Sequence, residues 1–444
     1  MCVAHPSVEP RGGAMTTRSE TGDERRTDGR RWRFRRGLAG LAVVLTAGAG
    51  LASCTVVAET KSVIQPRPTM RRVFDEMKRL VPLGLDESAW EAPENREEIL
   101  GALNRLDRAA SALEQHGRGR EAGFDELALT LGRDLRAARD HYVHGQYEEA
   151  RFFLTGSLQS CVSCHTRLPD MTNVPFTEEL TQEARVQSLD LREQAWLSVM
   201  VRRFDDALAL WEEALADPDV PAAQLDASGA LVDFLNVAIR VRTDVPRARA
   251  TLDRFAKRTD LPIYLAQRVD TWRKALAAID EKEFAEAGPG SVDRGAALAR
   301  EAGRLAAGPY GRDGLVHDLT AASQLVRFLE VDRARRAASN RNPTAAERME
   351  TSRAYYWLGV VEDRSLDGFW INLSERHFEA AIRADPRGPF AERAYAQLEE
   401  TQVLGFGGAS GEYLPPDVWA RLKELRELMG VEGDPPMTVP DGID

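Results

Sequence analysis

The chain has 444 residues, of which 43% are hydrophobic and 29% are charged, and its net charge at pH 7 is −11. This length is enough for roughly two or three domains with buried cores. The acidic balance argues against a nucleic-acid partner, because phosphates require a basic surface. It suits a soluble electron carrier or a partner that carries basic patches.

The first 53 residues are expected to direct export from the cytoplasm. Residues 1–29 are polar, have no pattern and are predicted to be a disordered start. A basic region and then an apolar run from Gly37 to Ala52 follow; the basic residues are Arg30, Arg31, Arg33, Arg35 and Arg36. The apolar run is too short for a comfortable membrane span and is typical of a signal peptide. Removal of residues 1–53 leaves 50 basic and 65 acidic residues, a net charge of −15.

The apolar run ends in Leu51-Ala52-Ser53-Cys54, which resembles a bacterial lipobox. By that resemblance Cys54 becomes the lipidated first residue of the mature protein and anchors it in the cell envelope, on the periplasmic side. The residue after the cysteine is not Asp, which favours the outer membrane. The alternative is an ordinary signal peptide cut near Ala52, which leaves an incidental cysteine. Residues 54–68 are predicted to be a tether, because Pro66 and Pro68 interrupt any helix.

Residues 69–170 have the apolar spacing of four helices. We expect the first from Met70, capped by Thr69 and ended by Pro82 and Gly84, the next two over 94–116 and 121–144, and the last from Gln146 to Leu168-Pro169. Short connections make neighbouring helices antiparallel, so the sequence predicts an up-and-down four-helix bundle. Its expected inward residues include Val73, Met77, Leu80, Leu103, Leu106, Leu131, Leu135, Leu154, Leu158 and Cys161.

The last of these helices carries Cys161-Val162-Ser163-Cys164-His165. Two thiols three positions apart, with histidine directly after the second, are typical of a c-type haem attachment site. Each sulfur bonds one vinyl group of the haem, and the histidine is the proximal ligand of the iron. On a helix Cys161, Cys164 and His165 share one face. We therefore expect one covalently attached haem c.

Three other interpretations of the cysteine pair compete with haem. The pair could form a disulfide, or half of a zinc site that needs two further ligands. The only other thiols are Cys2 and Cys54, both in the export region. A thioredoxin-like pair requires a βαβ setting, whereas the surroundings are predicted to be helical.

Four helices with this motif near the end of the last one resemble the cytochrome c-prime family, the class II c-type cytochromes. The resemblance implies a haem inside the bundle and, in members with a sixth ligand, a methionine from the first helix. Met77 is the preferred candidate because a helical turn on either side would fix it, and Met70 is the alternative. Both are also explained as core filler. His141, His144 and Met171 are lesser candidates.

After its histidine this family often carries an aromatic residue and then Arg, and the sequence departs from that pattern in having Thr166 before Arg167. Arg167 is a candidate to pair with a haem propionate, and the alternative is a solvated, exposed Arg.

Residues 175–432 are predicted to be a second helical domain, followed by a disordered tail over 433–444. Ala195, then Phe204, Ala207, Trp211 and Ala214, have the spacing of a tetratricopeptide repeat, as do Tyr355, Leu358, Gly359, Phe378 and Ala381. A looser match stands at Ala248, Leu252 and Phe255. The resemblance implies a superhelix whose concave face binds a protein. The alternative is a helical domain that merely packs on the haem bundle. The Gly-rich segment 405–411 lacks the Lys and strand context of a phosphate loop, so we expect no nucleotide site.

The sequence therefore predicts an all-α, non-enzymatic, lipid-anchored c-type cytochrome. Its tetratricopeptide-like domain would dock it to a redox partner protein or a membrane complex. The first alternative is a five-coordinate haem protein that binds or senses gas. The second is an envelope assembly scaffold with a structural haem, and a haem peroxidase is a distant further alternative, since no distal His or Arg can be placed.

Overall fold

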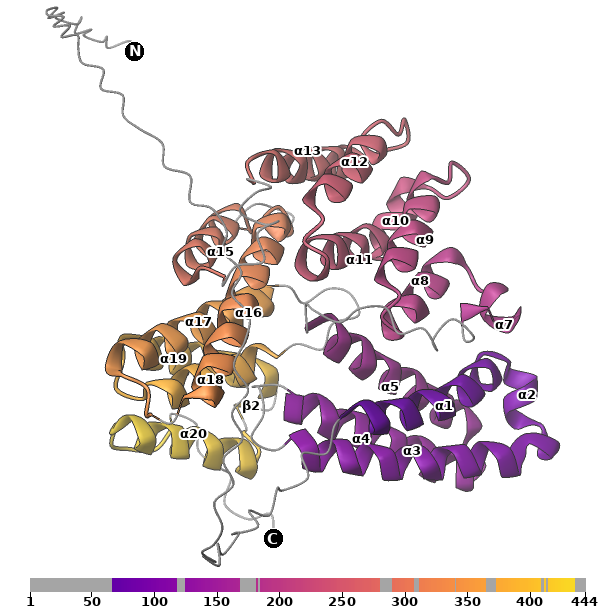
Figure 1. Ribbon diagram of the computed structural model, residues 1–444, viewed down its shortest axis with the longest axis horizontal. Coiled ribbons are helices and arrows are strands. Elements are labelled where there is room, and N and C mark those ends of the chain that lie inside the picture. Colours follow the sequence, from indigo (N-terminus) through magenta and orange to yellow (C-terminus); the bar gives the residue numbers. More distant parts are fainter. Residues whose placement is uncertain are drawn as a thin grey trace, which may run out of the picture. The chain divides into compact units, whose positions relative to one another are not determined.

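The computed structural model describes residues 66–117, 124–167, 181–182, 184–279, 290–306, 311–339, 341–364, 373–408, 411–412 and 414–435 (Figure 1). The chain divides into two compact units, residues 1–61 and 62–444, so all of the described residues belong to the second unit. They are almost entirely helical, which confirms the predicted all-α class. The predicted export region, the predicted lipidation site at Cys54 and Met171 lie outside the described residues, as do residues 168–170 and 436–444.

The motif-bearing helix belongs to the N-terminal helices, a name used here for the elements from α1 to α5. Their bounds are α1 Pro66–Leu85, α2 Glu87–Glu91, the 3₁₀ turn η1 Pro93–Asn95, α3 Arg96–Gly117, α4 Phe124–Val143 and α5 Tyr147–Arg167. Helix α1 packs on α3, α3 on α4, and α4 on α5. Ion pairs from Arg136 to Glu114 and from Arg139 to Asp107 fix α3 and α4 as antiparallel neighbours. Each helix buries the apolar face that its 3.6-residue period defines.

The expected bounds of the first helix were wrong at both ends. Helix α1 begins at Pro66, not at Met70, and it continues through Pro82 to Leu85. A proline in the first turn is tolerated because its missing N–H would have no helical partner there. At the other end, burial of Val81 and Leu83 holds the last turn in place although Pro82 removes one backbone hydrogen bond.

The short elements α2 and η1, which the sequence analysis missed, close one end of the N-terminal helices. Trp90 of α2 is fully buried and donates from Nε1 to the carbonyl of Tyr147 at 3.1 Å. The Tyr142 hydroxyl donates to the Trp90 carbonyl at 3.0 Å, and the two rings meet edge to face. Arg151 of α5 donates from Nε to the carbonyl of Gly84 at 3.1 Å. The C-terminal end of α1 is therefore held against the N-terminal half of α5.

The remaining described elements form the C-terminal helices. Their bounds are α7 Ala184–Gln187, α8 Leu191–Met200, α9 Phe204–Ala216, α10 Ala222–Ala227, α11 Ala230–Leu235, the π-helical η3 Asn236–Val241, α12 Val245–Phe255, α13 Ile263–Ala277, α15 Val292–Ala306, α16 Leu315–Ala338, α17 Ala345–Arg364, α18 Ser374–Ala384, α19 Pro389–Phe406 and α20 Pro416–Met429. Part of the expected Gly-rich loop is instead a minimal antiparallel pair, β1 Gly407–Gly408 with β2 Gly411–Glu412. Among the described helices, none is both long and apolar enough to cross a bilayer.

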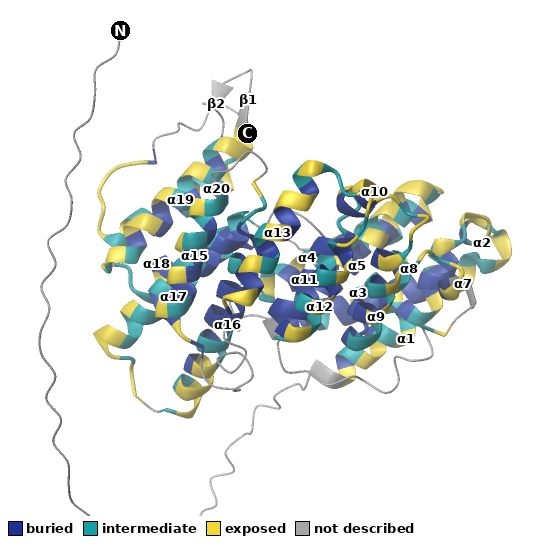
Figure 2. Ribbon diagram, turned by 90° about the horizontal axis from the view of Figure 1, so that it is seen from above, coloured by how far each residue is buried: buried dark blue, intermediate teal, exposed yellow. Residues whose placement is uncertain are grey.

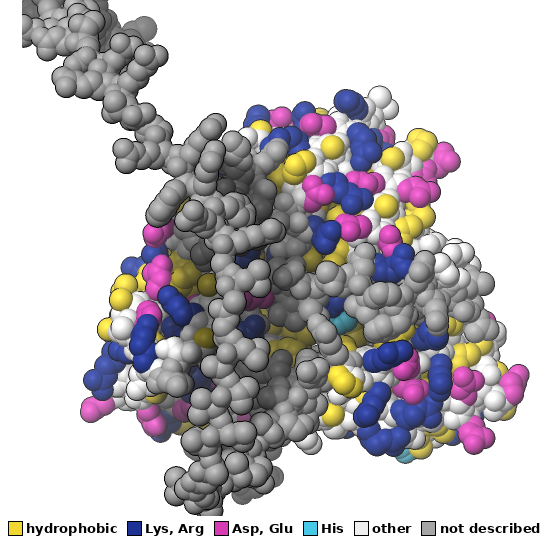
Figure 3. All heavy atoms as spheres, viewed as in Figure 1, with side chains coloured by type: hydrophobic (Ala, Val, Ile, Leu, Met, Phe, Trp, Pro, Cys, Tyr) yellow, Lys and Arg dark blue, Asp and Glu magenta, His cyan; other side chains and the backbone are white. Residues whose placement is uncertain are grey.

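Buried positions lie where neighbouring helices face one another, and exposed positions lie on the outer sides (Figure 2). One apolar cluster extends from α1 through α5 to residues of α16, so the N-terminal helices share their core with the first part of the C-terminal helices. Two further clusters lie among α15, α16 and α17 and among α17 to α20. On the outside of α1 and α3, Lys and Arg side chains gather (Figure 3), as expected for the polar face of amphipathic helices.

Helices α8 and α9 pack as a pair, and so do α15 with α16 and α17 with α18. At each of the last two contacts a glycine faces a large side chain. A Cβ on Gly359 would lie 2.6 Å from Cε1 of Phe378, and a Cβ on Gly295 would lie 2.7 Å from Cγ of Leu325. These glycines let the paired helices approach closely, which explains physically why small and large residues alternate at the spacing seen in the sequence.

We expect Gly359→Ala to destabilise the protein. The new methyl group would overlap the fully buried Phe378 ring, and overpacking of this kind costs about 1–3 kcal/mol. Thermal or urea unfolding measures the loss. Gly405→Ala is the matched control, because a Cβ there meets nothing within 4 Å. Equal stability of Gly359→Ala and the wild-type protein would contradict the close packing of α17 on α18.

Candidate cofactor-attachment site

Cys161, Cys164 and His165 lie in the last two turns of α5. Cys161 is buried, whereas Cys164 and His165 are partly buried. Burial, and after it the proximity of Cys164, raises the pKa of the Cys161 thiol to about 12. Cys161 therefore carries its proton at neutral pH, and it forms no disulfide with Cys164 in the structure. The motif presents two thiols and an imidazole along one side of a helix.

The competing metal interpretation finds no support in the described part of the chain. No group of three or more His, Cys, Asp and Glu side chains there could hold a metal ion. A βαβ setting for a redox-active cysteine pair is also absent from the described residues around the motif, where α5 packs on helices. Cys2 and Cys54 lie outside the described residues.

The His165 ring is oriented by the end of helix α8. Its Nδ1 lies 2.5 Å from the carbonyl oxygen of Met200, the last residue of α8. A carbonyl only accepts hydrogen bonds, so Nδ1 carries the proton and Nε2 carries the lone pair. This is the tautomer in which Nε2 ligates a metal and the other ring nitrogen is held by a backbone carbonyl.

The Met200 carbonyl can accept a hydrogen bond from His165 because of the way in which helix α8 ends. The backbone N–H of Arg203 donates to the carbonyl of Ser198 at 2.8 Å, and that of Arg202 donates to Val199 at 2.9 Å. This is the Schellman pattern of helix termination. It leaves the Met200 carbonyl without a backbone partner from the turn, and His165 supplies the missing donor.

Electrostatics keep His165 neutral. Burial and then the positive charge of Arg202 lower the pKa of His165 to about 3, although the bond to Met200 acts in the opposite direction. A neutral imidazole with its lone pair on Nε2 is the form that binds iron. The sequence analysis could not reveal the Met200 contact, because a backbone carbonyl 35 positions away has no residue-type signature.

Helices α1 and α5 meet where Gly84 faces Leu154. A Cβ on Gly84 would lie 3.0 Å from Cδ2 of Leu154, so these residues mark the facing sides of the two helices. At about 100° per residue, Met77 lies about 20° from the direction of Gly84, and His165 lies about 20° from the direction of Leu154. Ideal helix geometry alone therefore puts Met77 and His165 on these facing sides, while Nδ1 of the His165 ring bonds the Met200 carbonyl of α8.

The positions of Met70 and Met77 along the axis of α1 do not favour one of them as the sixth ligand. Counting from Gly84 and Leu154 along antiparallel helices at about 1.5 Å per residue, Met77 lies about 6 Å to one side of the level of His165, and Met70 about 4.5 Å to the other. Because α1 begins at Pro66, Met70 also has a helical turn on either side. What distinguishes Met77 is its burial, since it is 2% exposed and Met70 is only partly buried.

Of the other residues predicted for the site, His141 and His144 lie far from His165, and the side chain of Arg167 is not described. His141 and His144 lie at the C-terminal end of α4, beside the start of α5, where they bond Gln146 and the Asp140 carbonyl, each at 2.7 Å. His165 is about 27 Å further along α5 at 1.5 Å per residue. Arg167 is the last residue of α5, and its side chain lies outside the described part of the structure.

A residue that the sequence analysis missed is Arg202, which follows the Met200 turn. It is 6% exposed, and its Nη1 has no hydrogen-bond partner among the described residues. Its φ of 63° places it in the left-handed region, where glycine is usual at this position of a Schellman turn. Burial lowers the pKa of its guanidinium, and the nearby Cys164 raises it.

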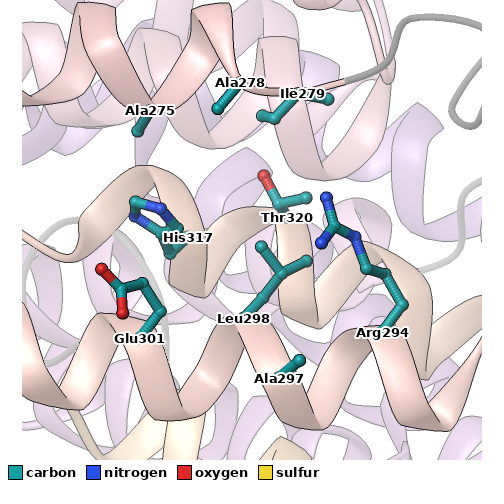
Figure 4. A pocket seen from close by; sticks show the side chains of 9 residues that line it. All are labelled: Ala275, Ala278, Ile279, Arg294, Ala297, Leu298, Glu301, His317 and Thr320. Atoms are coloured by element: carbon teal, nitrogen blue, oxygen red, sulfur yellow. The ribbon is translucent and has the colours of Figure 1, made fainter. Parts of the chain in front are cut away.

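The C-terminal helices also contain a cavity of about 200 Å³ between α13, α15 and α16. Figure 4 shows His317 and Glu301 at one end and Arg294 at the other, beneath the small side chains of α13. Burial lowers the pKa of His317. The cavity is lined by no residue of the cysteine–histidine motif, so it is separate from the site on α5.

Comparisons with protein-family models, with curated proteins and with solved structures gave no match.

Proposed function

We propose that the protein is a mono-haem c-type cytochrome that carries electrons to or from a partner in the cell envelope. The observation that carries the proposal is the hydrogen bond from Nδ1 of His165 to the Met200 carbonyl. It places the imidazole lone pair on Nε2, beside two thiols with the spacing for covalent haem attachment. A haem c bound here supplies iron that cycles between the ferric and ferrous states.

The residues present fit such a group. Cys161 and Cys164 would hold it covalently, and His165 would ligate its iron. The Met200 carbonyl prevents the ring from turning and increases its basicity. Because His165 is neutral and held in one orientation, it would ligate the iron in both oxidation states with little rearrangement. The buried apolar side chains of α1, α3, α4 and α5 would keep water from the haem face.

The proposal includes a finer account of the fold. Helices α1, α3, α4 and α5 are a four-helix haem bundle similar to class II c-type cytochromes, with Met77 or Met70 as the sixth ligand. The helices from α8 onward are tetratricopeptide-like, with paired helices that meet at small residues, and they dock a redox partner. The support is the antiparallel packing of the first set and the glycine contacts of the second.

Export and anchoring complete the proposal. The segment from Arg30 to Ser53 is a lipoprotein signal peptide, and the mature protein is attached through lipidated Cys54 on the periplasmic side of the outer membrane. The support is the sequence pattern alone, since these residues lie outside those described. Covalent haem attachment and export are consistent with each other, because c-type haem is added outside the cytoplasmic membrane.

The sixth ligand is tested with Met77→Leu and Met70→Leu. Leucine conserves volume, so each variant should lose less than about 1.5 kcal/mol of stability, while it removes the thioether. We expect the ferrous wild-type protein to be low-spin and unaffected by carbon monoxide. We expect Met77→Leu to become high-spin and to bind carbon monoxide fully, whereas Met70→Leu resembles the wild type.

The two variants form a matched pair, because each replaces one methionine of α1 with the same side chain. Carbon monoxide binding only in Met70→Leu would make Met70 the ligand. Carbon monoxide binding in the wild-type protein itself would contradict a methionine ligand and favour the gas-binding alternative.

A further inference from the structure

The cavity between α13, α15 and α16 has an apolar middle and a polar group at either end. Helix α15 lines it with Arg294, Leu298 and Glu301, which lie at i, i+4 and i+7 and so share one face of the helix. Helix α13 lines it with Ala275 and Ile279, again one helical turn apart. Leu298 and Ile279 are buried, at 6% and 7% exposed. A ligand in this cavity would therefore need an apolar body.

The end of the cavity at Arg294 is suited to an anion. Figure 4 shows the Arg294 guanidinium at the same end as Thr320. The Thr320 hydroxyl donates to the carbonyl of Val316 at 2.7 Å, so it is the guanidinium that offers N–H donors to a ligand at this end. A guanidinium carries five N–H groups in a planar fork, which can match both oxygens of a carboxylate and still make other contacts.

The opposite end of the cavity offers a hydrogen-bond acceptor and a neutral imidazole, from Glu301 and His317 (Figure 4). A hydrogen bond from Nε of Arg304, at 3.0 Å, lowers the pKa of Glu301, so this carboxylate is ionised at neutral pH and only accepts. Burial lowers the pKa of His317, so its ring is neutral and carries one N–H. A hydroxyl group complements the two together, because it both donates and accepts.

The size of the cavity limits the ligand to about one ring. The volume of about 200 Å³ is somewhat larger than that of a cavity of about 150 Å³ that holds benzene. Arg294 and Glu301 are two helical turns apart, which is about 10 Å at 1.5 Å per residue. A single ring with one small polar group on each side fits this space and directs one group to either end. A rigid ring also loses little conformational freedom on binding.

We propose that this cavity binds an aromatic acid that carries a hydroxyl group opposite its carboxylate, such as para-hydroxybenzoate. The carboxylate binds Arg294, and the ring lies against Ile279 and Leu298. The hydroxyl group donates to Glu301 and accepts from His317. The ligand would contact side chains from two of the apolar clusters, one on α13 and one on α15. This inference goes beyond the proposed function, because it does not depend on haem.

The test is equilibrium dialysis of the full-length wild-type protein against para-hydroxybenzoate, benzoate and para-cresol. Benzoate lacks the hydroxyl group, and para-cresol lacks the carboxylate. We expect para-hydroxybenzoate to bind, and para-cresol to bind roughly tenfold more weakly or less, because it loses a hydrogen bond to a charged group. Benzoate should also bind more weakly than para-hydroxybenzoate. Absence of para-hydroxybenzoate binding would overturn the proposal.

Two variants test the polar ends of the cavity. Arg294→Gln should weaken the binding of para-hydroxybenzoate roughly tenfold or more and leave that of para-cresol unchanged. Glu301→Gln should weaken the binding of para-hydroxybenzoate and leave that of benzoate unchanged. Arg300→Gln is the matched control, since it removes the same charge from α15 at a position that does not line the cavity. It should leave all three affinities unchanged.

A second pair of variants tests the cavity itself. Ala277 and Ala278 are exposed neighbours on α13, but only Ala278 lines the cavity. Because both positions are exposed, leucine at either should leave the protein folded, which thermal unfolding checks. We expect Ala278→Leu to block binding and Ala277→Leu to leave it unchanged.

The outcomes distinguish this inference from the proposed function. Equal binding of para-hydroxybenzoate by the wild-type protein, Ala278→Leu and Arg294→Gln would place the ligand elsewhere and overturn this site. Equal affinity of the wild-type protein for benzoate and para-hydroxybenzoate would overturn the role of Glu301 and His317. A wild-type protein that binds para-hydroxybenzoate but gains no covalent haem would overturn the proposed function and support this inference.

Discussion

Replacing both Cys161 and Cys164 with alanine should leave the protein without covalently bound haem, even when it is produced with the c-type maturation machinery. The thioether bonds require both sulfur atoms, and the described residues hold no other thiols. Haem staining after denaturing electrophoresis measures the loss, which should be complete. The single variants should each retain one thioether bond, and their pyridine haemochrome band should shift to longer wavelength.

Ser160→Ala is the matched control for the cysteine variants. Ser160 is buried in the same turn of α5, and its hydroxyl has no hydrogen-bond partner among the described residues. Removal of a buried, unpaired hydroxyl should cost little or even stabilise the helix contact. Full haem content in Ser160→Ala, beside none in the double variant, would assign the loss to the thiols. Covalent haem in the double variant would contradict the assignment of Cys161 and Cys164 as the attachment site.

The second large effect is expected from His165→Ala. Haem should still be attached through Cys161 and Cys164, but the low-spin spectrum should be lost because the proximal ligand is gone. Added imidazole should restore part of that spectrum, since it can enter the space of the missing ring and donate its N–H to the Met200 carbonyl. Absorbance titration with imidazole measures the recovery.

His144→Ala is the control for the histidine variant. Its Nδ1 also bonds a backbone carbonyl, that of Asp140 at 2.7 Å, but the ring is exposed and lies beside the opposite end of α5. It should keep the wild-type spectrum with or without imidazole. A His165→Ala protein that also keeps a normal low-spin spectrum would show that His165 is not the ligand.

Much of the helical fold could be predicted because each helix buries one apolar face, and that face repeats with the helical period. Val73, Met77 and Leu80 of α1 are buried as expected. The bounds of α1 were wrong because tertiary packing outweighed the local effect of Pro82. The pairing of α15 with α16 was missed because Gly295 and Leu325 make a contact that is clear only once the helices are placed.

The candidate site, like the fold, could be predicted from the sequence only in part. The positions of Cys161, Cys164 and His165 on one helical face follow from their spacing. The contact of His165 with Met200 does not, because it depends on how α8 ends and how it lies against α5. Arg202 was missed for a related reason: in the sequence it is one of two adjacent arginines, and only the backbone angle and the burial of its side chain set it apart.

The most direct test of the account is the absorbance spectrum of the ferrous full-length protein, produced with the c-type maturation machinery and recorded before and after addition of carbon monoxide. We expect covalently attached haem and a sharp low-spin spectrum that carbon monoxide leaves unchanged. A broad high-spin spectrum that shifts with carbon monoxide would contradict the sixth ligand. The absence of covalent haem would contradict the central claim that this chain is a c-type cytochrome.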